Sequence, residues 1–267
     1  MKLLQKQTVK IESSDSIVKF ETTGGSDWKV WDRFISIEGK KAFHIGNICG
    51  TCNFFFERLE GANKKVSQKS VIETVGNQPV QIYSAAYFEI VKLIPAGKYR
   101  VFILNVHPRF VRVGTDADYF VKEEIETFGI DGFWGLPHHP KINYYREVDV
   151  EIDDKSKLFS FLIPIVPENW LDDETVMLYR EKMGRGIVPT AIALSHIDIK
   201  EPADWDQGQK HTRHICFANY ILDGHHKLFA SAEAGKPLNL LSFVSIENSI
   251  CSAGEIDEVE KILAMGS

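Results

Sequence analysis

Short apolar runs separated by turn residues occupy the first part of the chain. Over residues 17–113 these runs are rich in Val, Ile, Phe and Tyr, and glycine or proline turns interrupt them at 24–25, 76–79 and 95–98. β-branched and aromatic residues favour strands, and glycine and proline favour the turns between strands. The pattern predicts a β-rich region, folded as a sandwich or a small barrel.

Helices and strands alternate in the last third of the chain. A helix is expected from an N-cap at Asp172 or Asp173 to Met183, with strands following over 190–199, 214–222 and 238–246. A helix over 227–234 separates the last two strands. A final helix begins after Ser252, because Glu255 three residues later completes a capping box.

Together these patterns predict an α+β protein with two domains. A β-rich domain is expected over residues 1–165, where it includes a Cys-x-x-Cys turn. An α/β domain is expected over residues 166–267. The length of 267 residues is sufficient for either one large domain or two small ones.

Composition narrows the classes of protein to consider. A hydrophobic share of 44% and a charged share of 25% are ordinary for a soluble globular protein. The formal net charge of -6 disfavours general binding to nucleic acids, because their phosphates attract basic proteins. No run of about eighteen apolar residues occurs. We therefore expect a cytoplasmic protein without a membrane partner, and the oligomeric state stays open.

The segment Asp223-Gly224-His225-His226-Lys227 joins a predicted strand to a predicted helix. A glycine permits the tight turn, and the first amides of the helix that follows have no partner within the helix. These amides and the positive end of the helix dipole attract anions, to which His226 or Lys227 can add a charged contact. The segment predicts a phosphate site; the alternative is a common turn that binds nothing.

This turn resembles the signature of the ParB/sulfiredoxin-like superfamily, which is a strand, a Gly-x-His/Arg-Arg turn and a helix. The resemblance covers residues 188–246 and includes Ala230, Gly235 and the closing strand. It implies a ParB-like α/β fold in which the turn binds the phosphates of CTP, ATP or ADP, with Mg²⁺ as a cofactor. Gly224 would permit the turn, Asp223 and His225 flank it, and His226 and Lys227 would contact phosphate.

Departures from the family pattern limit the chemistry. His225 stands where sulfiredoxins have cysteine and partition proteins have glutamate, so neither chemistry carries over. Kinase-like members need an acidic base, for which Asp198 and Glu201 are the candidates, as base or Mg²⁺ ligand; the alternative is two solvated carboxylates. The resemblance implies a nucleotide- or phosphate-binding protein, with phosphotransferase or nucleotide hydrolase activity to be tested. The alternatives are a nucleotide-gated interaction protein without turnover, and a zinc-stabilised structural protein with an unused loop.

Cys49 and Cys52 form a Cys-x-x-Cys turn, and two thiolates at this spacing can share one tetrahedral Zn²⁺. The sequence has no second Cys-x-x-Cys pair. The remaining ligands would therefore come from His44, His138, His139, Cys216 or Cys251. The alternatives are a redox pair and two cysteines without a special role.

Overall fold

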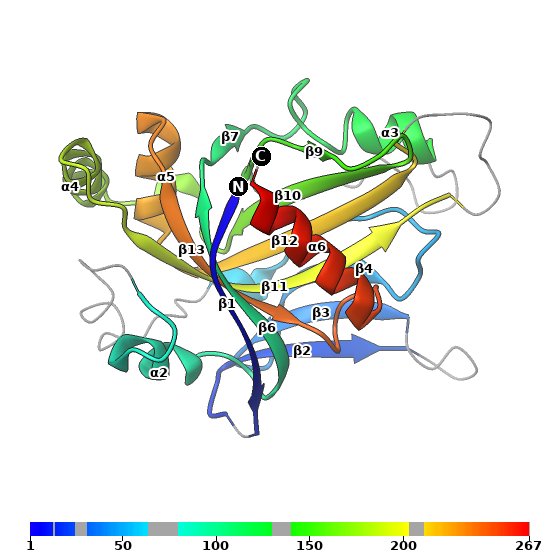
Figure 1. Cartoon of the computed structure of the whole chain (residues 1–267), viewed down its shortest axis with the longest axis horizontal. Helices are drawn as coiled ribbons and strands as arrows, with labels where there is room; N and C mark the ends of the chain where they lie inside the picture. The colour runs from blue at the N-terminus through cyan, green and yellow to red at the C-terminus, as the bar shows by residue number, and fades with distance from the viewer. Residues whose placement is uncertain (13, 25–30, 64–79, 130–139, 203–210, 267) are drawn as a thin grey trace.

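The computed structural model describes residues 1–12, 14–24, 31–63, 80–129, 140–202 and 211–266. Within them, the main element is a nine-stranded mixed β-sheet (Figure 1). Strands β10 and β12 run parallel, as do β11 and β13, and the other pairs are antiparallel. The strand order is β1 (Lys2–Ile11), β6 (Gly97–Val106), β13 (Leu238–Ser245), β11 (Thr190–Lys200), β12 (Arg213–Asp223), β10 (Ser156–Pro164), β8 (Tyr144–Arg146) and β7 (Arg109–Val111), with β9 (Val150–Glu151) beside β10.

The middle of this sheet is covered on both faces, which explains the nearly continuous apolar runs of its strands. Every residue of β11 is buried. Side chains of a strand alternate between the two faces, so Ile192 and Leu194 enter one core and Ala191 and Ala193 enter the other.

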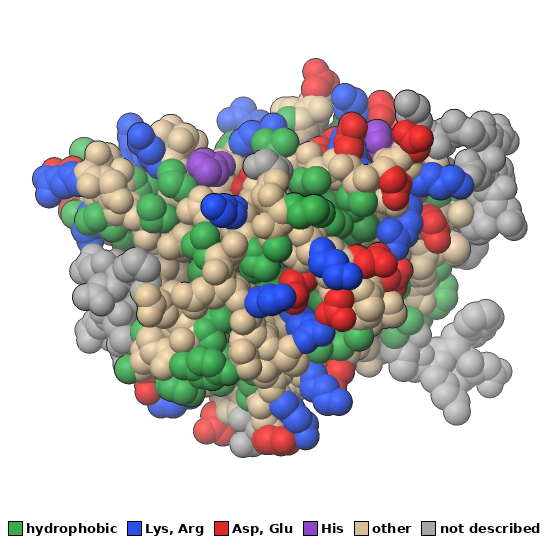
Figure 2. Space-filling model, viewed as in Figure 1, with side chains coloured by type: hydrophobic (Ala, Val, Ile, Leu, Met, Phe, Trp, Pro, Cys, Tyr) green, Lys and Arg blue, Asp and Glu red, His purple; other side chains and the backbone are tan. Residues whose placement is uncertain are grey.

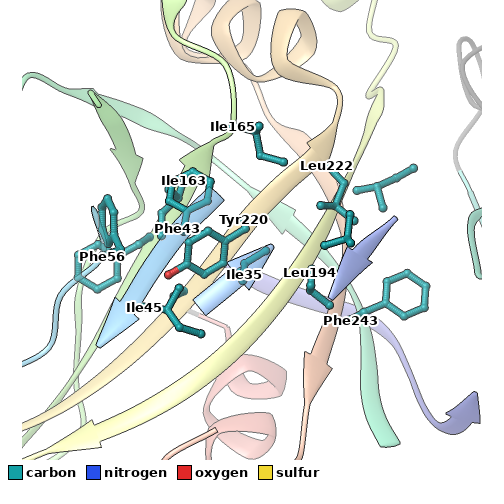
Figure 3. Packing of buried hydrophobic residues seen from close by; sticks show 14 of the residues in the cluster. Ile35, Phe43, Ile45, Phe56, Ile163, Ile165, Leu194, Tyr220, Leu222 and Phe243 are labelled. Atoms are coloured by element: carbon teal, nitrogen blue, oxygen red, sulfur yellow. The ribbon is translucent and has the colours of Figure 1, made fainter. Parts of the chain in front are cut away.

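A second, four-stranded antiparallel sheet packs on one face of the large sheet. It consists of β2 (Val18–Thr23), β3 (Asp32–Ile37), β4 (Lys40–Asn47) and β5 (Glu57–Arg58). Figure 3 shows the two sheets meeting through large apolar side chains, each of which stabilises the fold by about 1.5–3 kcal/mol when fully buried. Those labelled are Ile35, Phe43, Ile45, Phe56, Ile163, Ile165, Leu194, Tyr220, Leu222 and Phe243.

Helices cover the opposite face of the large sheet (Figure 1). They are α4 (Asp173–Gly184), α5 (His225–Ala234) and α6 (Ala253–Met265). Their buried apolar residues are Val176 and Met183 on α4, Leu228 and Ala230 on α5, and Ile256, Val259 and Leu263 on α6. Elsewhere, α2 (Ala85–Val91) packs Tyr87 and Ile90 into the core between the sheets, and the shorter elements are α3 (Glu123–Phe128), η1 (Glu60–Asn63) and η2 (Glu168–Trp170).

The α+β class is confirmed, and so are the two helix caps predicted at Asp172 and Ser252. Asp172 caps α4 by accepting from Thr175 N, and the capping box of α6 is present. Helix α5 begins two residues earlier than expected, and Gly235 ends it in the left-handed conformation. The expected boundary between residues 165 and 166 runs through one sheet, because β10 pairs with β12 and β6 pairs with β13. It is therefore not a break between separate sheets.

Charged side chains of both signs are interspersed on the face shown in Figure 2. Two ion pairs tie the strands under α6 to that helix, Lys6 with Glu260 and Arg100 with Asp257. In the described part of the chain, no helix has both the length and the apolar character needed to cross a bilayer.

The capping box gives a stability prediction. Ser252 Oγ accepts from Glu255 N at 3.2 Å, and the Glu255 carboxylate accepts from Ser252 N at 2.8 Å. Ser252→Ala should lower the free energy of unfolding by about 1 kcal/mol, measured by urea denaturation, because it removes the acceptor for an unpaired helix amide. Ser252→Thr keeps that acceptor and should lose less; an equal loss in both variants would contradict this account of the cap.

Candidate functional site

The turn between β12 and α5 has the backbone geometry expected of it. Gly224 is the N-cap of α5 and has a left-handed φ of 96°. A Cβ at this position would lie 2.8 Å from the Cβ of Ala191, so the turn packs directly against β11 and requires glycine. As a glycine, the N-cap residue supplies no side-chain hydrogen bond to the first turn of α5. A helix start without a side-chain cap needs other partners for its first amides.

The two histidines of the turn hold the chain that connects β10 to α4. Nε2 of His225 accepts from Ile165 N at 3.1 Å, and Nε2 of His226 accepts from Asp172 N at 3.0 Å. The ring of His225 also hydrogen-bonds the backbone of Ile221, and burial lowers its pKa to about 4. His225 is therefore neutral at pH 7, as an imidazole that accepts from an amide must be.

Lys227 faces the interior of the protein. Its side chain is buried, and Nζ donates to the Thr190 carbonyl at 2.9 Å and lies 3.6 Å from the Asp223 carboxylate. Burial lowers the pKa of Lys227, while Asp223 acts in the opposite direction. The side chain thus anchors α5 to β11, and its contact with phosphate stays a prediction.

A cavity of 490 Å³ lies against the start of α5 and has His225 in its wall. A hollow of 340 Å³ lies next to it, along Phe229 and Glu233 of α5. Phe110, Tyr145 and Glu168 line both spaces, so we treat the two as one groove, called here the α5 groove. Its other polar lining residues are Lys141, Asn143, Asn169 and Arg112.

Asp198 and Glu201, the expected catalytic carboxylates, lie away from this groove. Thr190 at the start of β11 touches Lys227, but Asp198 is eight residues further along the same strand. At about 3.3 Å per residue the separation is about 26 Å. The structure therefore does not bring these carboxylates to the turn.

Asp198 instead forms the centre of a buried charged cluster. The Arg33 guanidinium donates to both of its oxygens, and His196 Nδ1 lies 3.0 Å away. Ile250 N also donates to Asp198 at 3.1 Å, and Lys200 Nζ is 3.9 Å distant. Burial acts to raise the pKa of Asp198, but the cationic partners, Arg33 above all, hold it below its ordinary value.

Cys49 and Cys52 are joined by a disulfide bond, with their Cα atoms 5.4 Å apart. Of the other expected zinc ligands, His138 and His139 lie outside the described residues. The described part of the chain contains no group of three or more His, Cys, Asp or Glu side chains placed to hold a metal ion. The zinc site stays a prediction, and so do the two alternatives, a redox pair and two cysteines without a special role.

A second buried polar cluster, not anticipated from the sequence, lies beneath α3. His214 Nδ1 is 2.7 Å from the Tyr119 hydroxyl, and its Nε2 is 3.0 Å from the Thr127 hydroxyl. Glu124 beside it is fully buried, and neither carboxyl oxygen has a hydrogen-bond partner among the described residues. Burial raises the pKa of Glu124 well above its ordinary value, and Asp118 adds to this effect.

Gly224 and Gly235 give a matched pair of substitutions. Both have a positive φ, but a Cβ at Gly235 meets nothing within 4 Å, whereas one at Gly224 collides with Ala191. Gly235→Ala should cost about 1–2 kcal/mol through backbone strain alone. Gly224→Ala should cost about 1–3 kcal/mol more because of overpacking, measured by urea denaturation. Equal costs would show that the turn is not packed against β11.

Glu124 gives a prediction of pH dependence. Because its folded-state pKa is raised, the folded protein keeps a proton that the unfolded chain releases above about pH 4.5, and stability falls as pH rises from there. Glu124→Gln should therefore raise Tm at pH 7 by several degrees and lose this advantage below about pH 4. Glu126→Gln, an exposed position on the same helix, serves as control. Parallel Tm curves for Glu124→Gln and the wild type would contradict burial of the carboxyl.

Comparisons with known proteins leave the family open. No family model, no curated protein and no solved structure matches the chain. The likeness of residues 188–246 to the ParB/sulfiredoxin-like superfamily thus stays a prediction from the motif.

Proposed function

We propose that the protein binds a nucleotide, or a phosphorylated small molecule of similar size, in the α5 groove. The observation that carries the proposal is the start of α5, where a left-handed glycine replaces a side-chain cap and the first helical residue lines a 490 Å³ cavity. Uncapped helix starts bind phosphates through their amides and dipole. A cavity of this volume is in the range of small-molecule sites.

The phosphates would lie at the end of the groove near His225. Lys141, Asn143 and Asn169 line this end and supply side-chain donors of the kind that phosphate oxygens accept from. Neutral His225 would define the shape of this end and would not supply charge, because its ring is occupied by Ile165 and Ile221. The main attraction would therefore come from the helix start, and Lys141, which is paired with Glu57, would add a smaller contribution.

The ring system of the ligand would extend from Phe110, where the two spaces meet, into the part of the groove that Arg112 and Phe229 line. Phe110 on β7 is 38% exposed, and its ring packs edge to face on Tyr145 at 5.4 Å. An exposed aromatic ring at the rim of a pocket can stack on a nucleobase. Arg112 lines the same part, and its guanidinium can stack on a ring or donate to an anionic group.

Glu168 lies where the two parts of the groove meet, and Asn143 Nδ2 donates to its carboxylate at 3.1 Å. A bare carboxylate repels phosphate, but Mg²⁺ commonly bridges one or two carboxylates and phosphate oxygens. Binding would therefore require Mg²⁺. Since Asp198 and Glu201 are remote, binding without turnover is better supported than phosphoryl transfer.

A thermal-shift panel tests the proposal. ATP, ADP, CTP and pyrophosphate at millimolar concentration, each with Mg²⁺, should raise Tm. At 100 times Kd the gain is about 2.7 kcal/mol, or about 5–10 °C for a domain of this size. Phe110→Ala should weaken the response to nucleotides but not to pyrophosphate, and Asn169→Asp should weaken both through charge repulsion. Phe88→Ala, also at an exposed ring, should change neither.

No shift with any of these ligands would refute the proposal. An undiminished shift in Asn169→Asp would place the ligand elsewhere. Chromatography of the nucleotide over hours shows whether a product forms. A product would favour the enzymatic alternative over binding alone.

A further inference from the structure

The disulfide between Cys49 and Cys52 lies at the Lys200 end of β11, remote from the α5 groove. Only Gly50 and Thr51 separate the two cysteines. In the chain-entropy account a cross-link stabilises a fold less the shorter the loop it closes, so this bond contributes little as a structural staple. The bond is therefore of interest for its reactivity with thiols and less for its contribution to stability.

The bond is accessible from solvent. Both cysteines are partly exposed, and the two residues between them are exposed. The disulfide loop therefore lies at the protein surface, and exchange requires that an external thiolate reach one of its sulfurs. The other thiols differ: Cys216 is fully buried, and burial raises the pKa of Cys251 to about 12.

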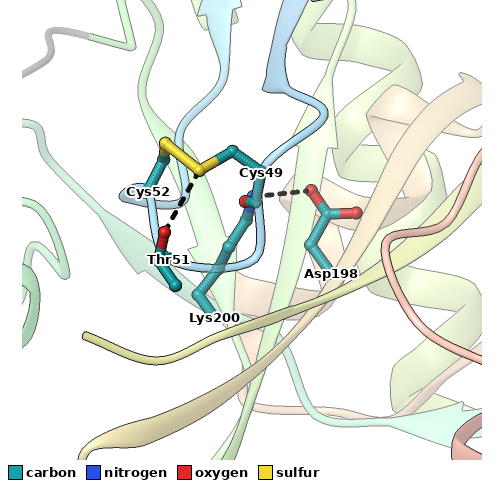
Figure 4. The surroundings of a disulfide bond; sticks show 5 residues. All are labelled: Cys49, Thr51, Cys52, Asp198 and Lys200. Carbon is teal, nitrogen blue, oxygen red and sulfur yellow. Dashed lines mark hydrogen bonds and ion pairs between the residues drawn. A yellow bond between two sulfur atoms is a disulfide. The ribbon is translucent and has the colours of Figure 1, made fainter. Parts of the chain in front are cut away.

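The last residue of β11 and the residue after it hold the disulfide loop through two contacts. Lys200 Nζ donates to the Cys49 carbonyl at 2.5 Å, and Glu201 N donates to the Gly50 carbonyl at 3.0 Å. Figure 4 shows the Lys200 side chain running beneath the loop, with its ammonium between Cys49 and Asp198. The Thr51 hydroxyl is 3.5 Å from Cys49 Sγ. Cys49 therefore has both a nearby cation and a hydroxyl donor.

The charges around the loop favour an anion there. Arg33 and Lys200 face the one negative charge of Asp198; burial lowers the pKa of Lys200, and Asp198 acts in the opposite direction. Burial lowers the pKa of His196, which leaves that ring neutral at pH 7. The cluster thus has a surplus positive charge next to Cys49, and positive surroundings stabilise a thiolate relative to a thiol.

We infer that Cys49 and Cys52 form a thiol–disulfide exchange centre that takes dithiols and disulfides as substrates. Cys49 is the nucleophilic cysteine and Cys52 the resolving one. Lys200 is a positioning residue that holds the loop and favours the Cys49 thiolate. This inference is independent of ligand binding in the α5 groove.

The exchange balances with a dithiol as reductant. One thiolate of the dithiol attacks Cys49 Sγ, the bond between the cysteines breaks, and Cys52 leaves as a thiolate that takes up a proton. The second thiolate of the dithiol then attacks the dithiol sulfur that is bonded to Cys49. Cys49 leaves as a thiolate and takes up a proton. The dithiol becomes a disulfide, having passed two electrons and two protons to the protein. The reverse sequence reduces a disulfide substrate.

Turnover is tested with the full chain, dithiothreitol as the dithiol and insulin as the disulfide substrate. The wild type should accelerate insulin reduction several-fold over dithiothreitol alone. Cys49→Ser and Cys52→Ser should each return the rate to the background. Cys251→Ser, which removes a thiol outside the pair, should keep the wild-type rate. Acceleration that survives Cys49→Ser, or none in the wild type, would overturn the inference.

The role of Lys200 is tested by the pH dependence of iodoacetamide alkylation at Cys49, in a Cys52→Ser background. The midpoint should lie below about 8.5, the value for an unperturbed thiol. Lys200→Met should raise it by about one unit, a tenfold loss of thiolate at neutral pH. Thr51 is exposed, so Thr51→Ala should leave the fold intact. This substitution should raise the midpoint by a smaller amount than Lys200→Met. An ordinary midpoint in the Cys52→Ser protein with Lys200 intact, or one zinc ion bound per reduced wild-type chain, would overturn the inference.

Discussion

The pairing of Arg33 with Asp198 is the contact that the two-sheet arrangement depends on. Arg33 belongs to β3 of the small sheet and Asp198 to β11 of the large one, and both are buried where the sheets meet. Removal of one partner of a buried charge pair costs about 3–5 kcal/mol, since the other charge is then left in an apolar interior. The guanidinium also donates to the carbonyls of Ile45 and Asn248. One side chain therefore fixes the small sheet, β11 and the chain leading to α6.

Strand β11 connects the two sites while keeping them apart. Its first residue, Thr190, accepts from Lys227 and so positions the start of α5, and its last residue, Lys200, holds the disulfide loop. Between these ends the strand pairs with β13 from Thr190 to Ser195 and with β12 from Ile192 to Lys200. Ser195 at its middle joins a buried polar group with Asn219 and Ser242, which adds a side-chain link across the same three strands.

Features that depend on neighbouring residues could be predicted from the sequence, and features that depend on distant partners could not. The caps at Asp172 and Ser252 use acceptors within three residues, so their patterns are complete in the sequence. The orientation of Lys227 depends on the Thr190 carbonyl, 37 residues away, and a basic residue beside a turn gives no sign of such a partner.

One signal of the charged cluster was nonetheless present in the sequence. His196, Asp198 and Lys200 alternate with apolar residues in β11, so a strand must place all three on one face. Charged residues on an inward face require partners of opposite charge. Arg33, 165 residues earlier in the chain, could be identified as that partner only from the packing of the two sheets.

The position of β6 in the large sheet affects the order in which the protein can be completed during synthesis. β6 lies between β1, which is made before it, and β13, whose residue Leu238 pairs with Val106 across 132 residues of chain. While the ribosome makes that segment, one edge of β6 has no strand beside it. Exposed strand edges template pairing with other chains. In a chain whose β1 and β6 have already paired, this edge therefore stays open until β13 has been made.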